Sequence, residues 1–144
     1  TYFETRGARG IIQGNEEPEW PGLLPSAKGM IFPVFHIFRF VLAHSNFNII
    51  KSVSTDPLSV DCLSLASGKE ARLVVVNYSD KPAQVRIEGL TGKFRMVPLD
   101  DSTSAEASAD CRWTGTRHQK SFNPSDIISL NPNSVNFIEG WLKT

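Results

Sequence analysis

Three side chains near the amino terminus combine one carboxylate with two guanidinium groups. Glu4 follows the apolar pair Tyr2-Phe3, and Arg6 and Arg9 come shortly after it. A carboxylate at the end of a strand can bind substrate hydroxyl groups, and arginines can donate hydrogen bonds to hydroxyl or carboxylate groups. The same residues could instead pair with one another and anchor the next loop. We therefore keep Glu4 as a weak catalytic candidate, and Glu4 and Arg6 as candidates for substrate binding.

A single tryptophan stands in the loop that follows. Trp20 lies between Pro18 and Pro21, and a rigid aromatic face can stack on the apolar C–H face of a sugar. The alternative is a plug that pins the loop, since tryptophan is usually well buried. We keep Trp20 as a candidate for substrate binding. The nearby carboxylates are expected to be solvated, because adjacency in a loop fixes no geometry: Glu16, Glu17 and Glu19.

The three histidines do not form a catalytic set. His36 falls inside an apolar segment, His44 falls at its end, and His118 lies in a basic turn. We expect a satisfied structural role for His36 and a favourable interaction of His44 with the end of a helix. The sequence contains no phosphate-binding loop, no Ser/His/Asp arrangement and no metal-ligand spacing. We therefore expect neither a metal nor a cofactor.

The two cysteines are far apart in the sequence and belong to no zinc-binding pattern. Cys62 alternates with apolar residues and is most simply a small core residue. We expect Cys62 and Cys111 to be free thiols rather than a disulfide, and the redox compartment stays open.

The amino-terminal elements that would position these residues are a strand, a loop and a helix. Residues 1–6 are rich in strand formers, and three prolines and two glycines between Gly14 and Pro25 predict a long loop. Helical spacing of apolar residues predicts a helix over 33–44 that is apolar on nearly every side, with His36, Arg39 and Ala43 on a narrow strip. Such a helix must be covered from several directions, which one strand cannot do. We therefore expect residues 1–45 to be the last β/α unit of a larger domain.

The remainder of the chain alternates with the period of two that is typical of strands. The clearest segments are 72–78 and 83–88, and the whole pattern gives about seven or eight strands with regular turns. The predicted fold class is mainly β, with an antiparallel β-sandwich over residues 46–144. We expect a surface loop over 100–109 and Trp113 in a short edge strand. The expected core residues are Val74, Val76, Val85, Ile87, Phe94 and Phe137.

Composition excludes two classes of partner. Fifteen basic and fifteen acidic residues give a formal charge of zero, whereas a nucleic-acid surface needs a clustered basic excess. The longest apolar stretch, 31–43, is too short for a membrane span, which takes about 20 residues. We therefore expect no nucleic-acid partner and no membrane partner. No targeting segment is recognised in the sequence, and the localisation stays unknown.

The order of these parts resembles the carboxyl-terminal end of retaining glycoside hydrolases of the large (β/α)8 clan. Asn77-Tyr-Ser-Asp-Lys-Pro-Ala-Gln-Val-Arg-Ile87 is similar to the asparagine, turn and alternating strand of their sandwiches. Asn131-Pro-Asn-Ser-Val-Asn-Phe137 is similar to their closing strand. Within that group, Glu4-Thr-Arg-Gly7 followed by Phe32-Pro-Val-Phe-His36 resembles the D-apionate lactonase family, whose barrel is glycosidase-like although its substrate is a sugar lactone.

The resemblance implies a place for each part in a barrel enzyme. Residues 2–4 would be the eighth barrel strand, 6–29 the loop at the active-site face, and 32–44 the eighth helix, followed by the sandwich. Glu4 and Trp20 would then lie at the barrel mouth, where catalytic side chains come from strand ends. The carboxylate pair of retaining chemistry follows other strands of such a barrel, so no main catalytic residue is expected in this chain.

Three functions from different classes follow from these observations. The leading hypothesis is the accessory carboxyl-terminal region of a carbohydrate-active hydrolase, either a glycosidase or a sugar lactonase, with a sugar-derived substrate. The first alternative is an independent carbohydrate-binding sandwich, although Tyr78, Trp113 and Trp141 do not share period-two spacing in one strand. The second alternative is a structural interaction domain. The Val34/Phe38/Val41 stripe of the helix is expected to pack on the sandwich or on a second copy of the chain, so a homodimer is a further expectation. The chain alone is expected to be inactive.

Overall fold

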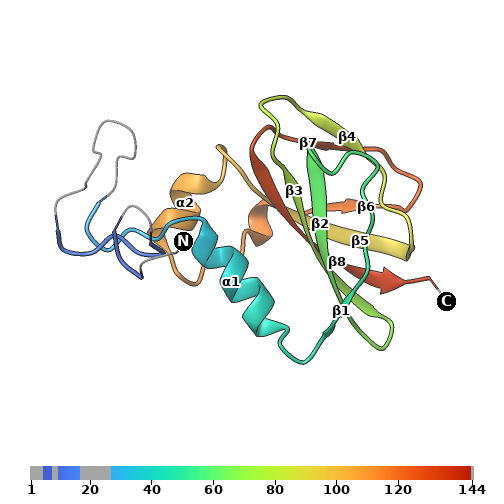
Figure 1. Cartoon of the computed structure of the whole chain (residues 1–144), viewed down its shortest axis with the longest axis horizontal. Helices are drawn as coiled ribbons and strands as arrows, with labels where there is room; N and C mark the ends of the chain where they lie inside the picture. The colour runs from blue at the N-terminus through green and yellow to red at the C-terminus, as the bar shows by residue number, and fades with distance from the viewer. Residues whose placement is uncertain (1–4, 8–9, 17–26, 144) are drawn as a thin grey trace.

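The structure, a computed structural model, describes residues 5–7, 10–16 and 27–143 (Figure 1). Glu4, Arg9 and Trp20 lie outside the described residues. The described elements, in chain order, are α1 (Val34–Ala43), β1 (Asn48–Ile50), β2 (Val60–Ser67), β3 (Glu70–Asn77), β4 (Ala83–Val85), β5 (Leu90–Leu99), α2 (Ser104–Ala109), the 3-10 turn η1 (Thr116–His118), β6 (Lys120–Phe122), β7 (Ile128–Leu130) and β8 (Ser134–Leu142).

The fold is mainly β and resembles a sandwich, as the alternating sequence pattern predicts. A six-stranded antiparallel sheet has the strand order β1-β2-β3-β8-β5-β6, and β4 pairs with β7 in a separate two-stranded sheet. The small sheet covers one face of the large sheet, and α1 and α2 lie over the opposite face (Figure 1). The large sheet is therefore covered on both sides, by strands on one and helices on the other.

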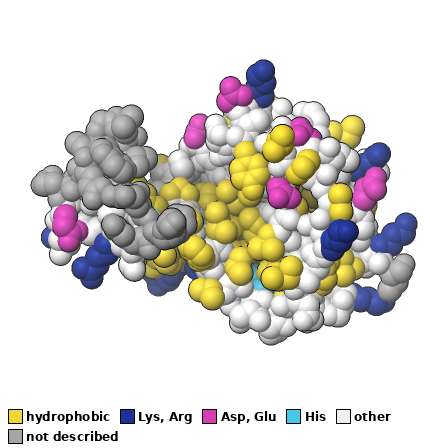
Figure 2. All heavy atoms as spheres, in the orientation of Figure 1, with side chains coloured by type: hydrophobic (Ala, Val, Ile, Leu, Met, Phe, Trp, Pro, Cys, Tyr) yellow, Lys and Arg dark blue, Asp and Glu magenta, His cyan; other side chains and the backbone are white. Residues whose placement is uncertain are grey.

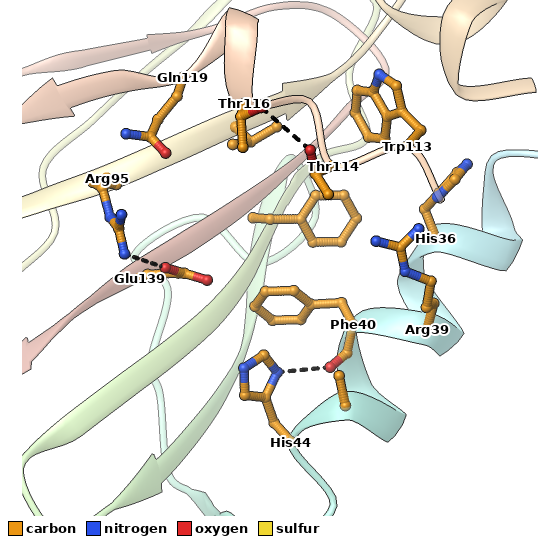
Figure 3. Close-up of a pocket in the computed structure, with 13 residues that line it drawn as sticks. His36, Arg39, Phe40, His44, Arg95, Trp113, Thr114, Thr116, Gln119 and Glu139 are labelled. Atoms are coloured by element: carbon orange, nitrogen blue, oxygen red, sulfur yellow. Dashed lines mark hydrogen bonds and ion pairs between the residues drawn. The ribbon is translucent and has the colours of Figure 1, made fainter. Parts of the chain in front are cut away.

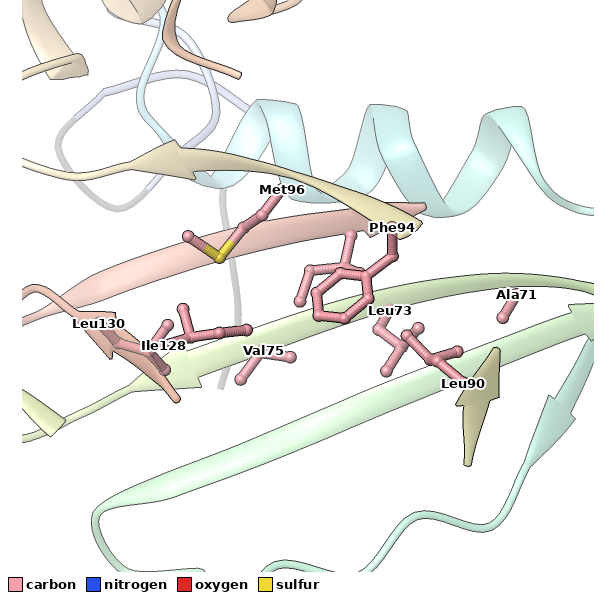
Figure 4. Close-up of a cluster of buried hydrophobic side chains, with 9 residues drawn as sticks. Ala71, Leu73, Val75, Leu90, Phe94, Met96, Ile128 and Leu130 are labelled. Carbon is pink, nitrogen blue, oxygen red and sulfur yellow. The ribbon is translucent and has the colours of Figure 1, made fainter. Parts of the chain in front are cut away.

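The main core fills the space between the two sheets. Leu73 and Val75 of β3 alternate inward with Phe94 and Met96 of β5, and they meet Ile128 of β7 (Figure 4). This alternation is the period-two pattern of a strand with one face toward each layer. Of the six predicted core residues, Phe94 is buried in this core and Val85 and Ile87 are half-buried against it. Val74 and Phe137 are buried, and Val76 half-buried, on the opposite face of the large sheet, because successive residues of a strand point to opposite faces. Each strand of the small sheet is only three residues long, so the small sheet covers only part of the face of the large sheet on which it lies.

A second core joins α1 and α2 to the opposite face of the large sheet. Ile37 and Phe40 of α1 pack against it, and the Phe40 ring lies 5.0 Å from that of Phe137 on β8. Ala107 of α2 has no exposed surface, and His36 Nε2 lies 2.8 Å from its carbonyl oxygen. The two helices are thus fixed to each other and to the sheet.

The helix α1 faces the sheet with a different stripe from the one predicted. The stripe Val34/Phe38/Val41 was expected to pack on the sandwich or on a second copy of the chain, yet Phe38 is 44% exposed. The polar strip that holds His36 and Arg39 faces inward instead. The reason is that His36 and Arg39 find backbone carbonyl partners there, on Ala107 and Cys111.

Two local predictions in the segment after β5 are wrong. Residues 104–109 form the helix α2 rather than a surface loop, and Trp113 is buried outside any strand. Alanine has the highest helix propensity, and a short helix needs only a small residue such as Ala107 to approach the sheet closely. Thr103, fully buried, stabilises the turn before α2, since its hydroxyl accepts a hydrogen bond from Asp100 N and lies 3.1 Å from Pro98 O.

Candidate functional site

The described part of the predicted site is small. Arg6 is exposed and forms a parallel bridge with Ile12. Glu4 and Trp20 lie outside the described residues, so the three predicted substrate-binding residues stay predictions. The base of the long loop is held by backbone hydrogen bonds, from Gln13 N to Met30 O at 2.8 Å and from Gly29 N to Gln13 O at 3.0 Å. Residues on both sides of the loop are therefore held together at its base.

A cavity of about 330 Å³ lies elsewhere, between α1, the β5–β8 part of the large sheet and the segment 113–119 (Figure 3). Its floor is apolar and comes from Phe40 of α1, Val97 of β5 and Phe137 of β8. Val97 and Phe137 are cross-strand partners in the β5–β8 register, which places both side chains on the helix-covered face. A volume of this size falls at the lower end of the range for small-molecule sites.

Arg95, Glu139 and His44 line one wall of the cavity, and the sheet register connects them to Arg72 outside the lining. Arg95, Glu139 and Arg72 are successive cross-strand partners on β5, β8 and β3. Arg95 Nη2 lies 2.7 Å from Glu139 Oε2, and Arg72 Nε donates a hydrogen bond of 3.1 Å to His44 Nε2. His44 Nδ1 lies 2.7 Å from the carbonyl oxygen of Phe40 and must donate to it. These partners fix the tautomer of His44.

His36 and Trp113 line the cavity, and each has one buried nitrogen without a hydrogen-bond partner among the described residues. His36 Nε2 must be the protonated nitrogen, since its partner Ala107 O can only accept. Its Nδ1 therefore carries a lone pair, and neither this atom nor Trp113 Nε1 has a hydrogen-bond partner among the described residues. The two rings lie 5.1 Å apart in an edge-on arrangement. Both nitrogens are enclosed by the surrounding atoms and have almost no surface exposed in the cavity.

Burial keeps His36 neutral. Loss of solvation lowers the pKa of His36 below its usual value, and the charge of Arg39 lowers it further. The hydrogen bond to Ala107 O and the charge of Asp110 act in the opposite direction but do not prevail.

Arg39 and Gly115 shape the remainder of the site. Arg39 Nη1 donates a hydrogen bond of 2.6 Å to Cys111 O, and its guanidinium group is directed into the cavity (Figure 3). Gly115 has φ +62°, and a Cβ atom there would meet Trp113 Cζ2 at 2.8 Å as well as Val97. Only glycine therefore allows the chain to pass this closely over the tryptophan ring.

Sequence reasoning did not predict this cavity. His36 and Arg39 were recognised as a polar strip on an otherwise apolar helix, and that strip is the part of α1 that lines the cavity. Trp113 and the β5–β8 pair come from segments far away in the sequence, so their meeting depends on strand pairing. A polar strip on an apolar helix was the feature that could have indicated the site.

The described residues contain neither a cluster of metal ligands nor a helix that could span a membrane. No group of three or more histidine, cysteine and acidic side chains in 5–7, 10–16 and 27–143 could hold a metal ion. Over the same ranges, none of the helices has the length and apolar character needed to cross a membrane. Cys62 is half-buried and Cys111 is exposed, and both are free thiols.

Comparison with known proteins gives distant structural similarities. No family model matches the chain, and no curated protein matches it. An α-L-arabinofuranosidase from Thermotoga maritima, in an arabinose complex, aligns over 58% of this chain and 19% of its own, with 22% identity and a TM-score of 0.37. A protein of unknown function from Acinetobacter sp. ADP1 aligns over 67% of this chain and 94% of its own, with 14% identity and a TM-score of 0.27. The chain thus has a distant structural similarity to part of a glycoside hydrolase.

Proposed function

We propose that this chain is the carboxyl-terminal region of a larger carbohydrate-active hydrolase, a glycosidase or a sugar lactonase. In this proposal residues 46–144 support a (β/α)8 barrel, residues 1–45 complete the barrel, and the loop 6–29 lines its cleft. The observation that carries the proposal is the apolar character of α1 on two opposite sides, of which the described structure covers only one.

The covered side of α1 packs on the large sheet through Ile37 and Phe40. On the other side, Phe38 is 44% exposed and Leu42 is 69% exposed, and hydrophobic side chains gather over this part of the molecule (Figure 2). Full burial of such a side chain stabilises a protein by about 1.5–3 kcal/mol. The last helix of a barrel that packs on a sandwich would bury both sides, one on each partner.

The sequence resemblance makes the proposal more specific. The motif 4–7 together with 32–36 is similar to the D-apionate lactonase family, which favours a sugar lactone as substrate over a glycoside. Glu4, Arg6 and Trp20 are then the residues of this chain proposed to bind substrate. The main catalytic groups would come from the preceding part of the barrel, because such sites combine side chains from several strand ends.

The test compares the 144-residue chain with the protein encoded by its complete gene. Both are assayed against a panel of aryl glycosides and sugar lactones. We expect hydrolysis by the complete protein and none by the 144-residue chain. The proposal is wrong if the gene encodes no barrel before Thr1, or if the short chain turns over substrate and loses that activity on Glu4→Gln.

A second variant tests the supporting role of α1 in the complete protein. Phe38→Glu with Leu42→Glu should lower the melting temperature and the hydrolytic rate, because it places two charges between barrel and sandwich. The matched control is Leu58→Glu, a change at an apolar residue that is 90% exposed in the turn before β2. Equal effects of the control and the helix variant would contradict the proposed interface.

A further inference from the structure

We propose that the open part of the large sheet around Trp141 binds a neutral saccharide chain. Trp141 provides a stacking surface, and the neighbouring Arg95–Glu139 pair provides hydrogen-bond donors and acceptors for hydroxyl groups. The inference goes beyond the proposed function and does not depend on it, because no residue proposed for the barrel cleft takes part.

The first argument is the place of Trp141 on β8, which lies between β3 and β5 in the large sheet. Phe137, Glu139 and Trp141 follow one another at intervals of two, so they point to one face of the sheet, and α1 packs on that face at Phe137. Further along β8, Trp141 stands between its strand partners Glu70 and Thr91 and is 51% exposed. The helix therefore covers this face at Phe137 and leaves Trp141 half open to solvent.

The second argument is the polar pair beside Trp141 on the same face. A single exposed apolar side chain needs no ligand to explain it, but Trp141 lies two residues from Glu139, whose strand partner is Arg95. The side chains of Arg95 and Glu139 are 57% and 38% exposed. A guanidinium group has five N–H donors and a carboxylate has two acceptor oxygens, so their mutual bond leaves both with free positions. An aromatic face beside exposed donors and acceptors suits a sugar, which stacks through C–H groups and bonds through hydroxyl groups.

The balance of charge in this part of the sheet favours a neutral ligand. Arg95 Nη2 lies 2.7 Å from Glu139 Oε2. In the neighbouring pair, Arg72 Nη2 lies 3.0 Å from Glu70 Oε2. Paired charges of opposite sign produce a weak field, whereas an anion or a cation is attracted by a cluster of one sign. These pairs therefore favour a neutral hydroxylated ligand over a sugar acid.

The third argument is that the same row of side chains continues to the cavity beside α1. Arg95 and Glu139 line this cavity together with Gln119, and the three side chains lie at one side of it (Figure 3). The Gln119 amide can both donate and accept hydrogen bonds. A ligand that stacks on Trp141 can therefore extend along β8, over the Arg95–Glu139 pair, toward Gln119. This elongated arrangement favours a chain of sugar units over a single sugar.

The test is a titration of the full 144-residue chain with three neutral chains (cellohexaose, xylohexaose and mannohexaose), with their monosaccharides and with hexagalacturonate. Binding is followed by calorimetry and by the NMR resonance of the Trp141 indole N–H. We expect at least one neutral chain to bind and to shift this resonance, with its monosaccharide and hexagalacturonate each at least about tenfold weaker.

Each other outcome contradicts a stated part of the proposal. Absence of binding by all three neutral chains at millimolar concentration would overturn it. Equal affinity for a monosaccharide would overturn the assignment to a chain of sugars, and equal or higher affinity for hexagalacturonate would overturn the assignment to a neutral ligand. Binding that shifts the Trp20 indole resonance but not that of Trp141 would place the sugar in the loop 6–29 instead.

Variants separate the site from a general affinity of exposed aromatic rings for sugars. Trp141→Ala should weaken binding of the neutral chain at least about tenfold. The matched control is Tyr78→Ala, because Tyr78 is 57% exposed and follows β3 at the end opposite to Glu70, the strand partner of Trp141. If Trp141→Ala lowers the melting temperature strongly, Glu139→Gln takes its place, since it keeps the size of the side chain and removes the charged acceptor. Unchanged binding in the folded variant, or an equal loss in Tyr78→Ala, would contradict the assignment.

Discussion

His36 shows how one hydrogen bond decides the chemistry of a side chain. Its Nε2 donates to Ala107 O, which fixes the tautomer and joins α1 to α2 across 71 positions of sequence. The sequence supported a structural role for this histidine, and the hydrogen bond to Ala107 confirms that part. The sequence could not predict that Nδ1 has no partner, because this depends on how the other elements pack around the imidazole ring.

The lowered pKa of His36 predicts a pH dependence of stability. The unfolded chain binds a proton on this residue near its ordinary pKa of about 6.5, while the folded chain resists protonation until a lower pH. The unfolded state therefore binds more protons between these two values, and stability falls as the pH drops through that window. Urea unfolding of the native chain at pH 7 and pH 5.5 should show this fall, and His36→Gln should reduce it.

The comparison with His36→Gln removes the contribution of every titrating group that the two chains share. The pKa values of Asp100 and Glu106 are also lowered in the fold, and their stabilisation is lost only in more acidic solution. Arg39 and Asp110 are the charged residues near His36. An identical pH dependence in native and His36→Gln chains would show that burial of this imidazole is not its cause.

Two glycines with the same backbone conformation allow a steric effect to be separated from backbone strain. Gly115 and Gly92 both have φ +62°, but an added Cβ would clash with Trp113 and Val97 at Gly115 and meet nothing within 4 Å at Gly92. Gly92→Ala should cost about 1 kcal/mol for strain alone. Gly115→Ala should cost about 1–3 kcal/mol more, the scale of overpacking. Denaturant unfolding measures both, and equal losses would contradict close packing over Trp113.

At the scale of elements, the local sequence pattern predicts where single strands and helices lie better than it predicts which strands pair with one another. The continuous apolar run at 72–78 lies almost entirely in β3, whereas only the first half of the alternating segment 83–88 pairs as a strand, β4. The pairing of β4 with β7, and the central place of β8 between β3 and β5, bring together segments far apart in sequence. Such pairing depends on how all the strands pack, which no single segment specifies. The sequence did not predict the helix α2, because α2 contacts the sheet through a single small residue, Ala107, and therefore has no apolar stripe that a sequence pattern could show.

Asn77 connects two turns and is the structural basis of the asparagine motif at the end of β3. It is fully buried, and its Nδ2 donates to Lys81 O at 2.8 Å and to Asn131 O at 2.9 Å. Its Oδ1 accepts hydrogen bonds from Ser79 N and Ser79 Oγ. The turn before β4 is thus tied to the turn between β7 and β8.

Replacing this residue should therefore destabilise the whole sandwich. Asn77→Ala removes these hydrogen bonds from a fully buried side chain, at a cost of about 0.5–1.5 kcal/mol for each bond. Asn48→Ala on the edge strand β1 is the control, because Asn48 is exposed and exposed substitutions usually change stability by less than about 0.5 kcal/mol. The midpoints of chemical unfolding should differ accordingly. Similar midpoints for the two variants would contradict a structural role for Asn77.

At the scale of the molecule, the described chain has an apolar helix that is covered on one side. The sequence predicted that a helix over 33–44 needs cover from several directions, and the sheet supplies part of that cover through Ile37 and Phe40. The strand and loop expected before the helix fall largely outside the described residues. Their place in a barrel is therefore a proposal, whereas the β-sandwich-like fold is established by the antiparallel strand pairing.

When the 144-residue chain is studied alone, the exposed side of α1 should drive self-association. Phe38 and Leu42 lie four residues apart, on the same side of the helix, and a second copy can cover both by packing helix against helix. Light scattering over a range of concentrations should show a dimer for the native chain. Phe38→Glu with Leu42→Glu should give a monomer with an unchanged far-ultraviolet spectrum, because neither side chain is part of either buried core cluster.

The control for this association is another exposed apolar residue away from α1. Ile127 precedes β7 and is 69% exposed, as is Leu42, so Ile127→Glu removes a comparable apolar surface while α1 stays intact. We expect this variant to dimerise like the native chain. A native chain that stays monomeric at high concentration would show that α1 does not support pairing of two copies. A dimer lost equally in both variants would place the contact elsewhere, since a specific interface depends on a few central apolar residues rather than on total apolar surface.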